Sequence, residues 1–86
     1  MTAQADTAVA LQYTEDLPAP FVIASGRGRL AEAIVAIARQ SGVTLVKDPI
    51  LADSLAYLAV NTFIPESLYE VVAELLAFVR NLDTER

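Results

Sequence analysis

Two strand-like runs separated by only seven residues place the main constraint on how this chain can fold. Ala8–Tyr13 and Phe21–Ala24 are rich in the apolar, β-branched and aromatic residues that are typical of buried strands. The connection 14–20 holds charged residues and two prolines, which turn the chain. A link this short does not suit a parallel crossover, which needs a dozen or more residues. We therefore expect the first strand to run antiparallel to one of the others in the sheet.

A helix and a third strand are expected next along the chain. Apolar residues recur at helical spacing over 29–40, and Gly42 stands where a left-handed residue ends such a helix. The run Val43–Val46 is β-branched and apolar, which predicts a strand. A helix between two strands makes them parallel neighbours through a right-handed crossover. The second and third strands are therefore expected to pair in parallel.

Two more helices complete the prediction. Asp48 can cap a helix N-terminus with Pro49 at the first helical position, and Asn61 suits a left-handed end to that helix. A last helix is expected from Pro65 to about Leu82, with an apolar stripe and an acidic row. The stripe holds Leu68, Val72, Leu75, Val79 and Leu82, and the row holds Glu66, Glu70 and Glu74. The predicted fold class is α/β: a small mixed β-sheet of about three strands packed with three helices.

The length of 86 residues fits a single domain. We expect a flexible N-terminus over 1–7, a folded domain over 8–82 and a tail over 83–86. The longest uncharged stretch, 54–65, has twelve residues, whereas a membrane helix needs about 20 apolar residues. The first six residues lack the basic and apolar regions of a signal peptide. These features predict a cytoplasmic protein that does not itself span the membrane.

Composition excludes several classes of function. The chain has no Cys and no His, which removes the commonest metal ligands and the Ser-His-Asp and Cys-His catalytic arrangements. The net charge of −5 disfavours binding to the phosphate backbone of nucleic acids. We therefore expect no enzymatic activity, no metal or organic cofactor, and no nucleic-acid partner.

A glycine-rich turn offers a different hypothesis. Gly26-Arg-Gly28-Arg-Leu-Ala31 follows a predicted strand and begins a predicted helix, as the dinucleotide-binding fingerprint does, and Asp48 could contact a ribose. A dinucleotide site needs two βαβ halves, and this chain has room for one. We therefore expect structural roles: Gly26 ends a strand, Gly28 begins a helix and Asp48 caps one. A small nucleotide-binding α/β domain remains the alternative function.

Several motifs together carry a family resemblance over residues 8–82. They are Ala8-Val-Ala-Leu-Gln-Tyr13, Ala19-Pro20, Val22, Gly26, Leu51-Ala52, Ile64-Pro-Glu-Ser-Leu-Tyr69 and Val72-Ala-Glu-Leu-Leu-Ala-Phe-Val79, in this order. The chain resembles the C-terminal cytoplasmic domain of the FlhB family, the switch component of flagellar and type III secretion export gates. This resemblance implies a non-catalytic protein-interaction module in protein secretion, located at the cytoplasmic face of the inner membrane. It does not distinguish a flagellar from an injectisome system.

One departure from the family concerns its self-cleavage. Family members place Asn-Pro-Thr-His just before the first of these motifs and cleave between Asn and Pro. Ala3, Gln4, Ala5 and Asp6 occupy those four positions here. Cleavage needs the Asn side-chain amide, which Ala3 lacks, so we expect no autocleavage.

The same comparison predicts an unpaired sheet edge. The membrane domain, and the strand that precedes the cleavage site in family members, have no counterpart in this sequence. We expect the edge formed by Val9, Leu11 and Tyr13 to pair with an export-gate membrane protein or its N-terminal cytoplasmic fragment. The chain would then substitute for the cleaved C-terminal fragment. The alternatives are that residues 1–7 cover this edge or that a homodimer does.

The resemblance also implies a binding patch for the N-terminal signals of exported subunits. By motif this patch comprises Ala19, Pro20, Ala73 and Leu76. The alternative is ordinary packing, since an Ala and a Leu three residues apart on a helix commonly face a core.

Overall fold

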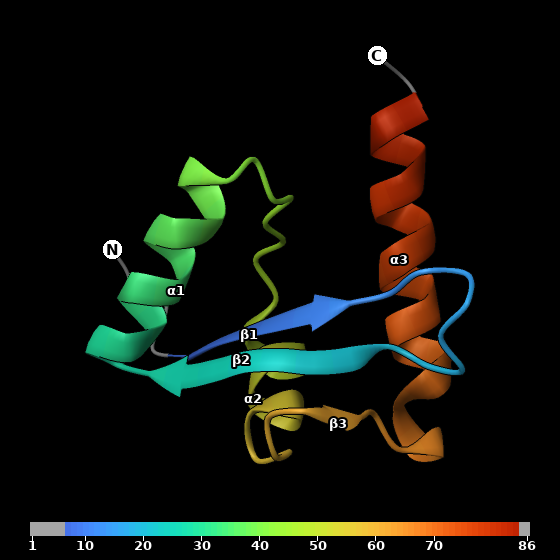
Figure 1. Cartoon of the computed structure of the whole chain (residues 1–86), viewed down its shortest axis with the longest axis horizontal. Helices are drawn as coiled ribbons and strands as arrows, with labels where there is room; N and C mark the ends of the chain where they lie inside the picture. The colour runs from blue at the N-terminus through green and yellow to red at the C-terminus, as the bar shows by residue number, and fades with distance from the viewer. Residues whose placement is uncertain (1–6, 85–86) are drawn as a thin grey trace.

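The computed structural model describes residues 7–84 (Figure 1). The elements follow in the order β1 (Thr7–Gln12), β2 (Phe21–Arg27), α1 (Arg29–Gln40), α2 (Pro49–Ala56), β3 (Thr62–Phe63), the short 3₁₀ helix η1 (Glu66–Leu68) and α3 (Tyr69–Thr84). Within these residues the fold has three strands and three α-helices. The predicted α/β class is therefore confirmed.

The sheet has the strand order β1-β2-β3, and both pairs are antiparallel. β1 and β2 pair from Thr7 opposite Arg27 to Gln12 opposite Phe21, with one irregularity between Ala10 and Leu11. The antiparallel direction predicted for the first strand is confirmed. Its physical reason is the short connection, which returns the chain along the same path.

The third strand is not the predicted one. Residues 43–46 form no strand and are exposed, with Val43 at 56%. The third strand, β3, lies further along the chain and runs antiparallel to β2, so the parallel crossover was also wrong. The Asn61 N–H donates to the Val22 carbonyl at 2.7 Å, and the Ile64 N–H donates to the Pro20 carbonyl at 3.0 Å. β3 pairs with Phe21 and Val22, at the start of β2, and thereby takes the place beside β2 that was predicted for 43–46.

The predicted helix signals have a mixed outcome. The Asp48 carboxylate accepts a hydrogen bond from the Leu51 N–H at 3.1 Å, and Pro49 is the first residue of α2. Gly42 has a φ of 74° just beyond α1, as expected of a left-handed residue after a helix. Asn61 is also left-handed, with a φ of 70°, but α2 already ends at Ala56. Asn61 therefore turns the chain into β3 instead of ending the helix.

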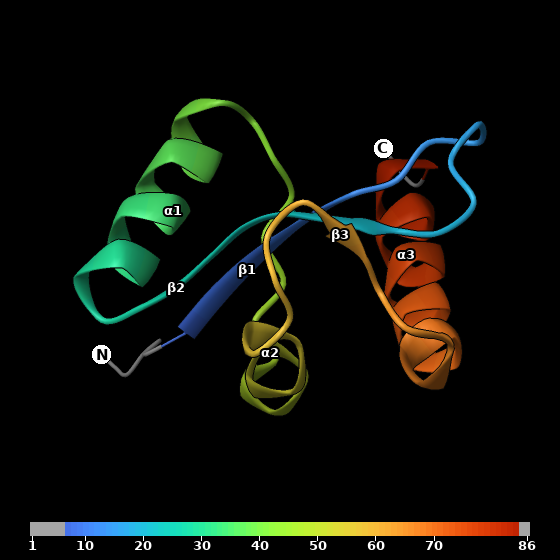
Figure 2. The same ribbon diagram turned by 60° about the horizontal axis from the view of Figure 1, so that its bottom comes forward.

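A small core joins β2 to α2 and α3. Val22 and Val72 are fully buried, and the cluster around them consists of Ala19, Leu51, Leu55 and Ile64. Figure 2 shows α2 on one side of the two long strands and α1 on the other. Glu66, Glu70 and Glu74 are exposed, as predicted, but Glu66 lies in η1, because α3 begins at Tyr69 and not at the predicted Pro65.

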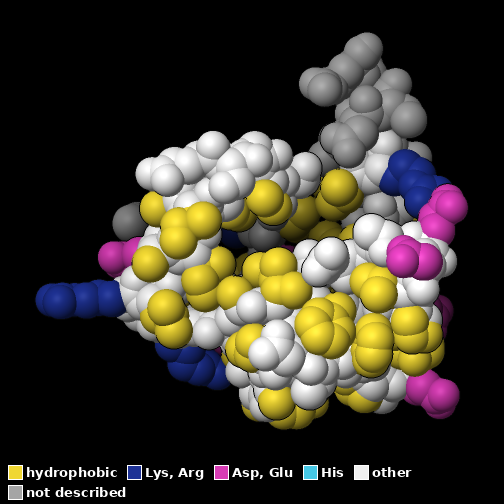
Figure 3. Space-filling model, viewed as in Figure 1, with side chains coloured by type: hydrophobic (Ala, Val, Ile, Leu, Met, Phe, Trp, Pro, Cys, Tyr) yellow, Lys and Arg dark blue, Asp and Glu magenta, His cyan; other side chains and the backbone are white. Residues whose placement is uncertain are grey.

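The other side of the sheet is partly covered. Phe21 and Phe63 face each other across the β2–β3 pair, edge to face, with ring centroids 5.1 Å apart. Ile23 keeps 45% of its surface exposed. Figure 3 shows hydrophobic side chains gathered over the strands on the side that it presents.

Matched valine substitutions test this account of the core. Val22→Ala should lower the free energy of unfolding by about 2 kcal/mol, because it removes two buried carbon atoms and leaves a cavity. Val43→Ala should change it by less than about 0.5 kcal/mol, because that side chain is exposed. Urea unfolding followed by circular dichroism measures both. Equal losses would mean that 43–46 packs as a core strand in solution.

Candidate functional site

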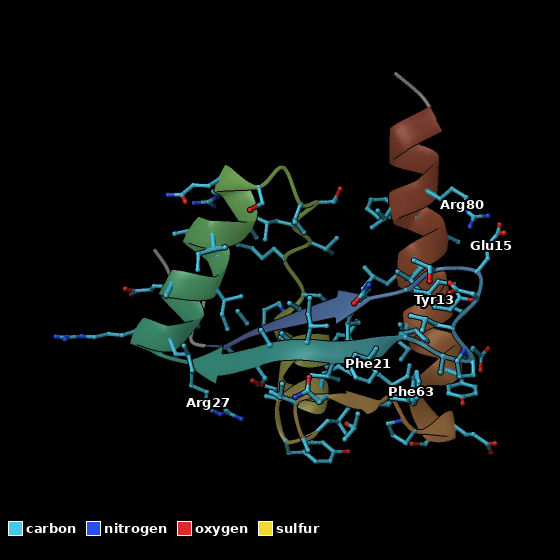
Figure 4. All side chains as sticks on the ribbon, viewed as in Figure 1. Tyr13, Glu15, Phe21, Arg27, Phe63 and Arg80 are labelled. Carbon is cyan, nitrogen blue, oxygen red and sulfur yellow. The ribbon has the colours of Figure 1, made fainter. Side chains whose placement is uncertain are left out.

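A groove of about 340 Å³ lies between the β1–β2 connection and α3. The connection contributes Tyr13, Pro18, Ala19 and Pro20, and the helix contributes Tyr69, Ala73, Leu76, Ala77 and Arg80. In Figure 4, Tyr13 lies at the end of the long strands near α3, and Arg80 extends from α3 itself. Small and apolar side chains dominate this lining. The groove is therefore suited to an apolar side chain of a partner.

All four residues of the implied signal-binding patch line this groove, but they are buried to different degrees. Ala19 is 4% exposed and belongs to the core. Pro20 is half-buried, and Leu76 is a partly buried residue packed against the core cluster. Ala73 is exposed. The alternative of ordinary core packing therefore applies to Ala19 and, in part, to Leu76. It does not apply to Ala73, whose side chain lies at the surface.

Sequence reasoning missed the rest of the lining. Tyr13 is predicted to belong to the strand edge, but it lies beyond the end of β1 and lines the groove. Tyr69, Ala73, Ala77 and Arg80 recur at intervals of three and four residues, which places them on one face of α3. That spacing was a signal that could have identified the helical wall.

Local hydrogen bonds shape the connection that forms the other wall. The Leu17 N–H donates to the Thr14 carbonyl at 3.0 Å, which closes a turn. The Thr14 hydroxyl donates to the Asp16 carboxylate, and this hydrogen bond, with a further one from the Asp16 backbone, lowers the pKa of Asp16. Hydrogen bonds within the loop itself therefore stabilise the exposed segment that precedes Pro18.

The predicted strand edge has one partner within residues 7–84, because β1 pairs with β2 alone. Val9 and Leu11 turn partly buried side chains toward the core cluster. Their main-chain groups, and not these side chains, lie on the outer edge of the sheet. The four positions that replace the cleavage motif, Ala3 to Asp6, lie outside the described residues.

The glycine-rich turn has a structural explanation. A Cβ atom on Gly26 would lie 2.8 Å from the Leu30 Cβ and 2.3 Å from its Cγ, so any larger residue there would force Leu30 to move. Gly28 has a φ of 59° and precedes the first residue of α1, as predicted. β2 continues to Arg27, so Gly26 lies within the strand and does not end it as expected.

The charged groups beside this turn contact each other. The Arg27 guanidinium lies 3.9 Å from the Asp53 carboxylate and donates to the Thr7 hydroxyl at 3.2 Å. Thr7 in turn donates to Asp53 at 3.1 Å. Asp48 serves as the cap of α2. Protein contacts therefore account for the residues that suggested a nucleotide site.

The described part of the chain, residues 7–84, has neither a cluster of metal-ligating side chains nor a membrane-spanning helix. No group of three or more acidic side chains there is arranged to hold a metal ion. None of its helices has the length and apolar character needed to cross a membrane.

Sequence comparisons identify relatives along nearly the whole chain. The model of the FlhB HrpN YscU SpaS family matches residues 2–79. The uncharacterised protein YlqH of Bacillus subtilis is 44% identical over 77 residues, which cover 88% of this chain and 83% of that protein. The flagellar biosynthetic protein FlhB of Helicobacter pylori is 40% identical over 80 residues, which cover 92% of this chain and 22% of that protein. The chain thus spans about a fifth of the length of that larger relative.

Solved structures share the fold. The cytoplasmic domain of FlhB from Shewanella putrefaciens superposes with a TM-score of 0.86 at 35% identity, over 92% of this chain and 66% of that one. The PscU C-terminal domain superposes with a TM-score of 0.82 at 26% identity, over 88% of this chain and 99% of that one. The resemblance inferred from the motifs is confirmed: the chain belongs to the FlhB HrpN YscU SpaS family and has the fold of that family's C-terminal cytoplasmic domains.

Proposed function

We propose that this chain is a non-catalytic interaction module of a type III or flagellar export apparatus, acting at the cytoplasmic face of the inner membrane. In this proposal the groove between the β1–β2 connection and α3 binds the N-terminal signals of exported subunits. The observation that carries the proposal is that the four residues implied by the family motifs converge on this one groove.

The chemistry of the groove supports binding of a short apolar segment. Ala73 and Ala77 are small and exposed, so a partner's side chain can approach the backbone of α3 closely. Pro18 and Pro20 restrict the backbone conformation of the opposite wall, so less conformational entropy is lost when a ligand binds. The floor, Ala19, belongs to the core and is held in place by it. A groove built in this way is formed before its partner arrives.

A charge placed in the groove tests the docking proposal. Ala73→Asp should weaken binding of synthetic N-terminal peptides of rod or hook subunits roughly tenfold or more, because the carboxylate would be desolvated by an apolar ligand. The fold should survive, since Ala73 is exposed. Peptide titration followed by NMR, with circular dichroism of each variant, makes the measurement.

The matched control is Ala36→Asp, an exposed alanine in the middle of α1. This variant should bind the peptides as the parent does. Equal binding by Ala73→Asp and the parent, with both folded, would place the peptide site elsewhere.

The outer edge of β1 supports a second role, in which the chain replaces the cleaved C-terminal fragment of an export-gate protein. A strand from that protein's N-terminal cytoplasmic fragment would add to β1 through main-chain hydrogen bonds. Its inward side chains would extend the core formed by Val9 and Leu11. Exposed apolar side chains of α1 and the following segment are available to such a partner: Leu30, Ile37, Val43, Leu45 and Val46. In Figure 3 the surface is hollowed between α1 and α3, on the side of β1 away from β2.

An isotope-labelled titration tests the strand-addition role. The N-terminal cytoplasmic fragment of the export-gate protein from the same organism should shift the amides of β1 and β2 at saturation, because new hydrogen bonds form along the edge. A fragment with prolines in its strand is the control and should not bind, since proline has no N–H.

Analytical ultracentrifugation of the chain alone separates the remaining possibilities. A monomer whose β1 amides do not move would mean that the edge is closed to this partner. A stable dimer that persists in the presence of the fragment would assign the edge to a second copy of the chain.

A further inference from the structure

We propose that the groove selects peptides that carry an acidic side chain two or three residues from their apolar anchor, with Arg80 as the residue that determines this selectivity. The inference rests on the docking role proposed above and specifies the chemistry of the ligand. Its occupant is a peptide segment of an exported subunit.

The helical wall of the groove sets the distances. Tyr69 and Arg80 are the first and last residues of α3 in the lining. Eleven residues of helix separate them along the axis by about 16 Å, at a rise of about 1.5 Å per residue. An extended peptide advances about 3.3 Å per residue, so roughly five peptide residues span this wall. The groove is therefore long enough to contact more than one side chain of the ligand.

The position of the anchor follows from the smallest lining residues. Ala73 and Ala77 leave room on either side of Leu76, with Ala19 opposite on the connection. Arg80 follows Leu76 by four residues, which is about 6 Å along the axis. The arginine side chain extends this distance somewhat. If the apolar side chain of the ligand binds beside Leu76, a ligand carboxylate that contacts Arg80 is therefore two or three residues away along the extended peptide.

The charge of the lining indicates which kind of ligand side chain binds at the Arg80 end of the groove. Arg80 is the only charged residue among the described residues that line it. Glu70 and Glu74 are exposed on α3 but are not part of the lining. A guanidinium can bind a carboxylate through two parallel hydrogen bonds, which gives both attraction and orientation. Although the whole chain carries a net charge of −5, distant surface charges are screened over about 8–10 Å at physiological salt.

We expect Glu15 to weaken this preference. Figure 4 shows Glu15 on the β1–β2 connection and Arg80 on α3 at the same side of the molecule. Arg80 already takes part in an interaction within the protein. Its five N–H donors can serve more than one acceptor, so a ligand carboxylate can be added. We therefore expect Glu15→Gln to strengthen the preference for acidic ligands by removing a negative charge from that side.

The experiment uses one rod- or hook-subunit N-terminal peptide in three forms. The residue two positions from its apolar anchor is Glu, Gln or Lys, and binding to the full chain is titrated by NMR at low and high salt. The parent should bind the Glu form about tenfold more tightly than the Lys form at low salt, with a smaller ratio at high salt. Arg80→Gln should bring the three affinities together, and Arg80→Glu should reverse their order.

Arg39→Glu on α1 is the matched charge control, because Arg39 is exposed and is not part of the groove. It should leave the order of the three peptides unchanged. If Arg80→Gln keeps the full preference for Glu over Lys, the inference is wrong, while the docking role stands as long as Ala73→Asp still weakens every form. If all forms bind Ala73→Asp as tightly as the parent, the docking role and this inference both fail.

Discussion

Burial of Val22 between the sheet and the helices α2 and α3 is the interaction on which the rest of the molecule depends. Val22 is completely buried, and it belongs to one hydrophobic cluster with residues from the connection, from α2 and from α3. A chain of this size has few such positions, so each one contributes a large share of a marginal stability. The central strand also binds β1 on one edge and β3 on the other. Val22 thus lies where the sheet and the hydrophobic cluster meet.

The groove is an outward continuation of that core. Ala19 belongs to the buried cluster and also lines the groove, so the floor of the groove is as rigid as the core. On α3, Val72 points into the core while its neighbour Ala73 is exposed. Successive helical residues differ by about 100° in direction, which lets one helix close the core and form a wall of the groove.

The sequence predicts local structure correctly where the conformation of one residue decides where a helix begins or ends. Asp48 and Pro49 begin a helix, and Gly42 adopts a left-handed φ, because capping chemistry and steric freedom act within a few residues. The pairing of strands is harder to predict from the sequence. The run 43–46 has the composition of a strand, but a strand exists only where another strand offers its hydrogen bonds. Two residues, Thr62 and Phe63, occupy the second edge of β2 instead.

The sequence by itself determined the family, the helix boundaries set by caps and glycines, and the exclusion of His- and Cys-based chemistry. Through the family resemblance it also indicated four candidate patch residues. Only the tertiary structure decided which of these are core and which are surface, since burial depends on what packs above each residue. The membership of Tyr13, Tyr69 and Arg80 in one groove was likewise decided in three dimensions, because they come from segments more than fifty residues apart that meet only when the core closes.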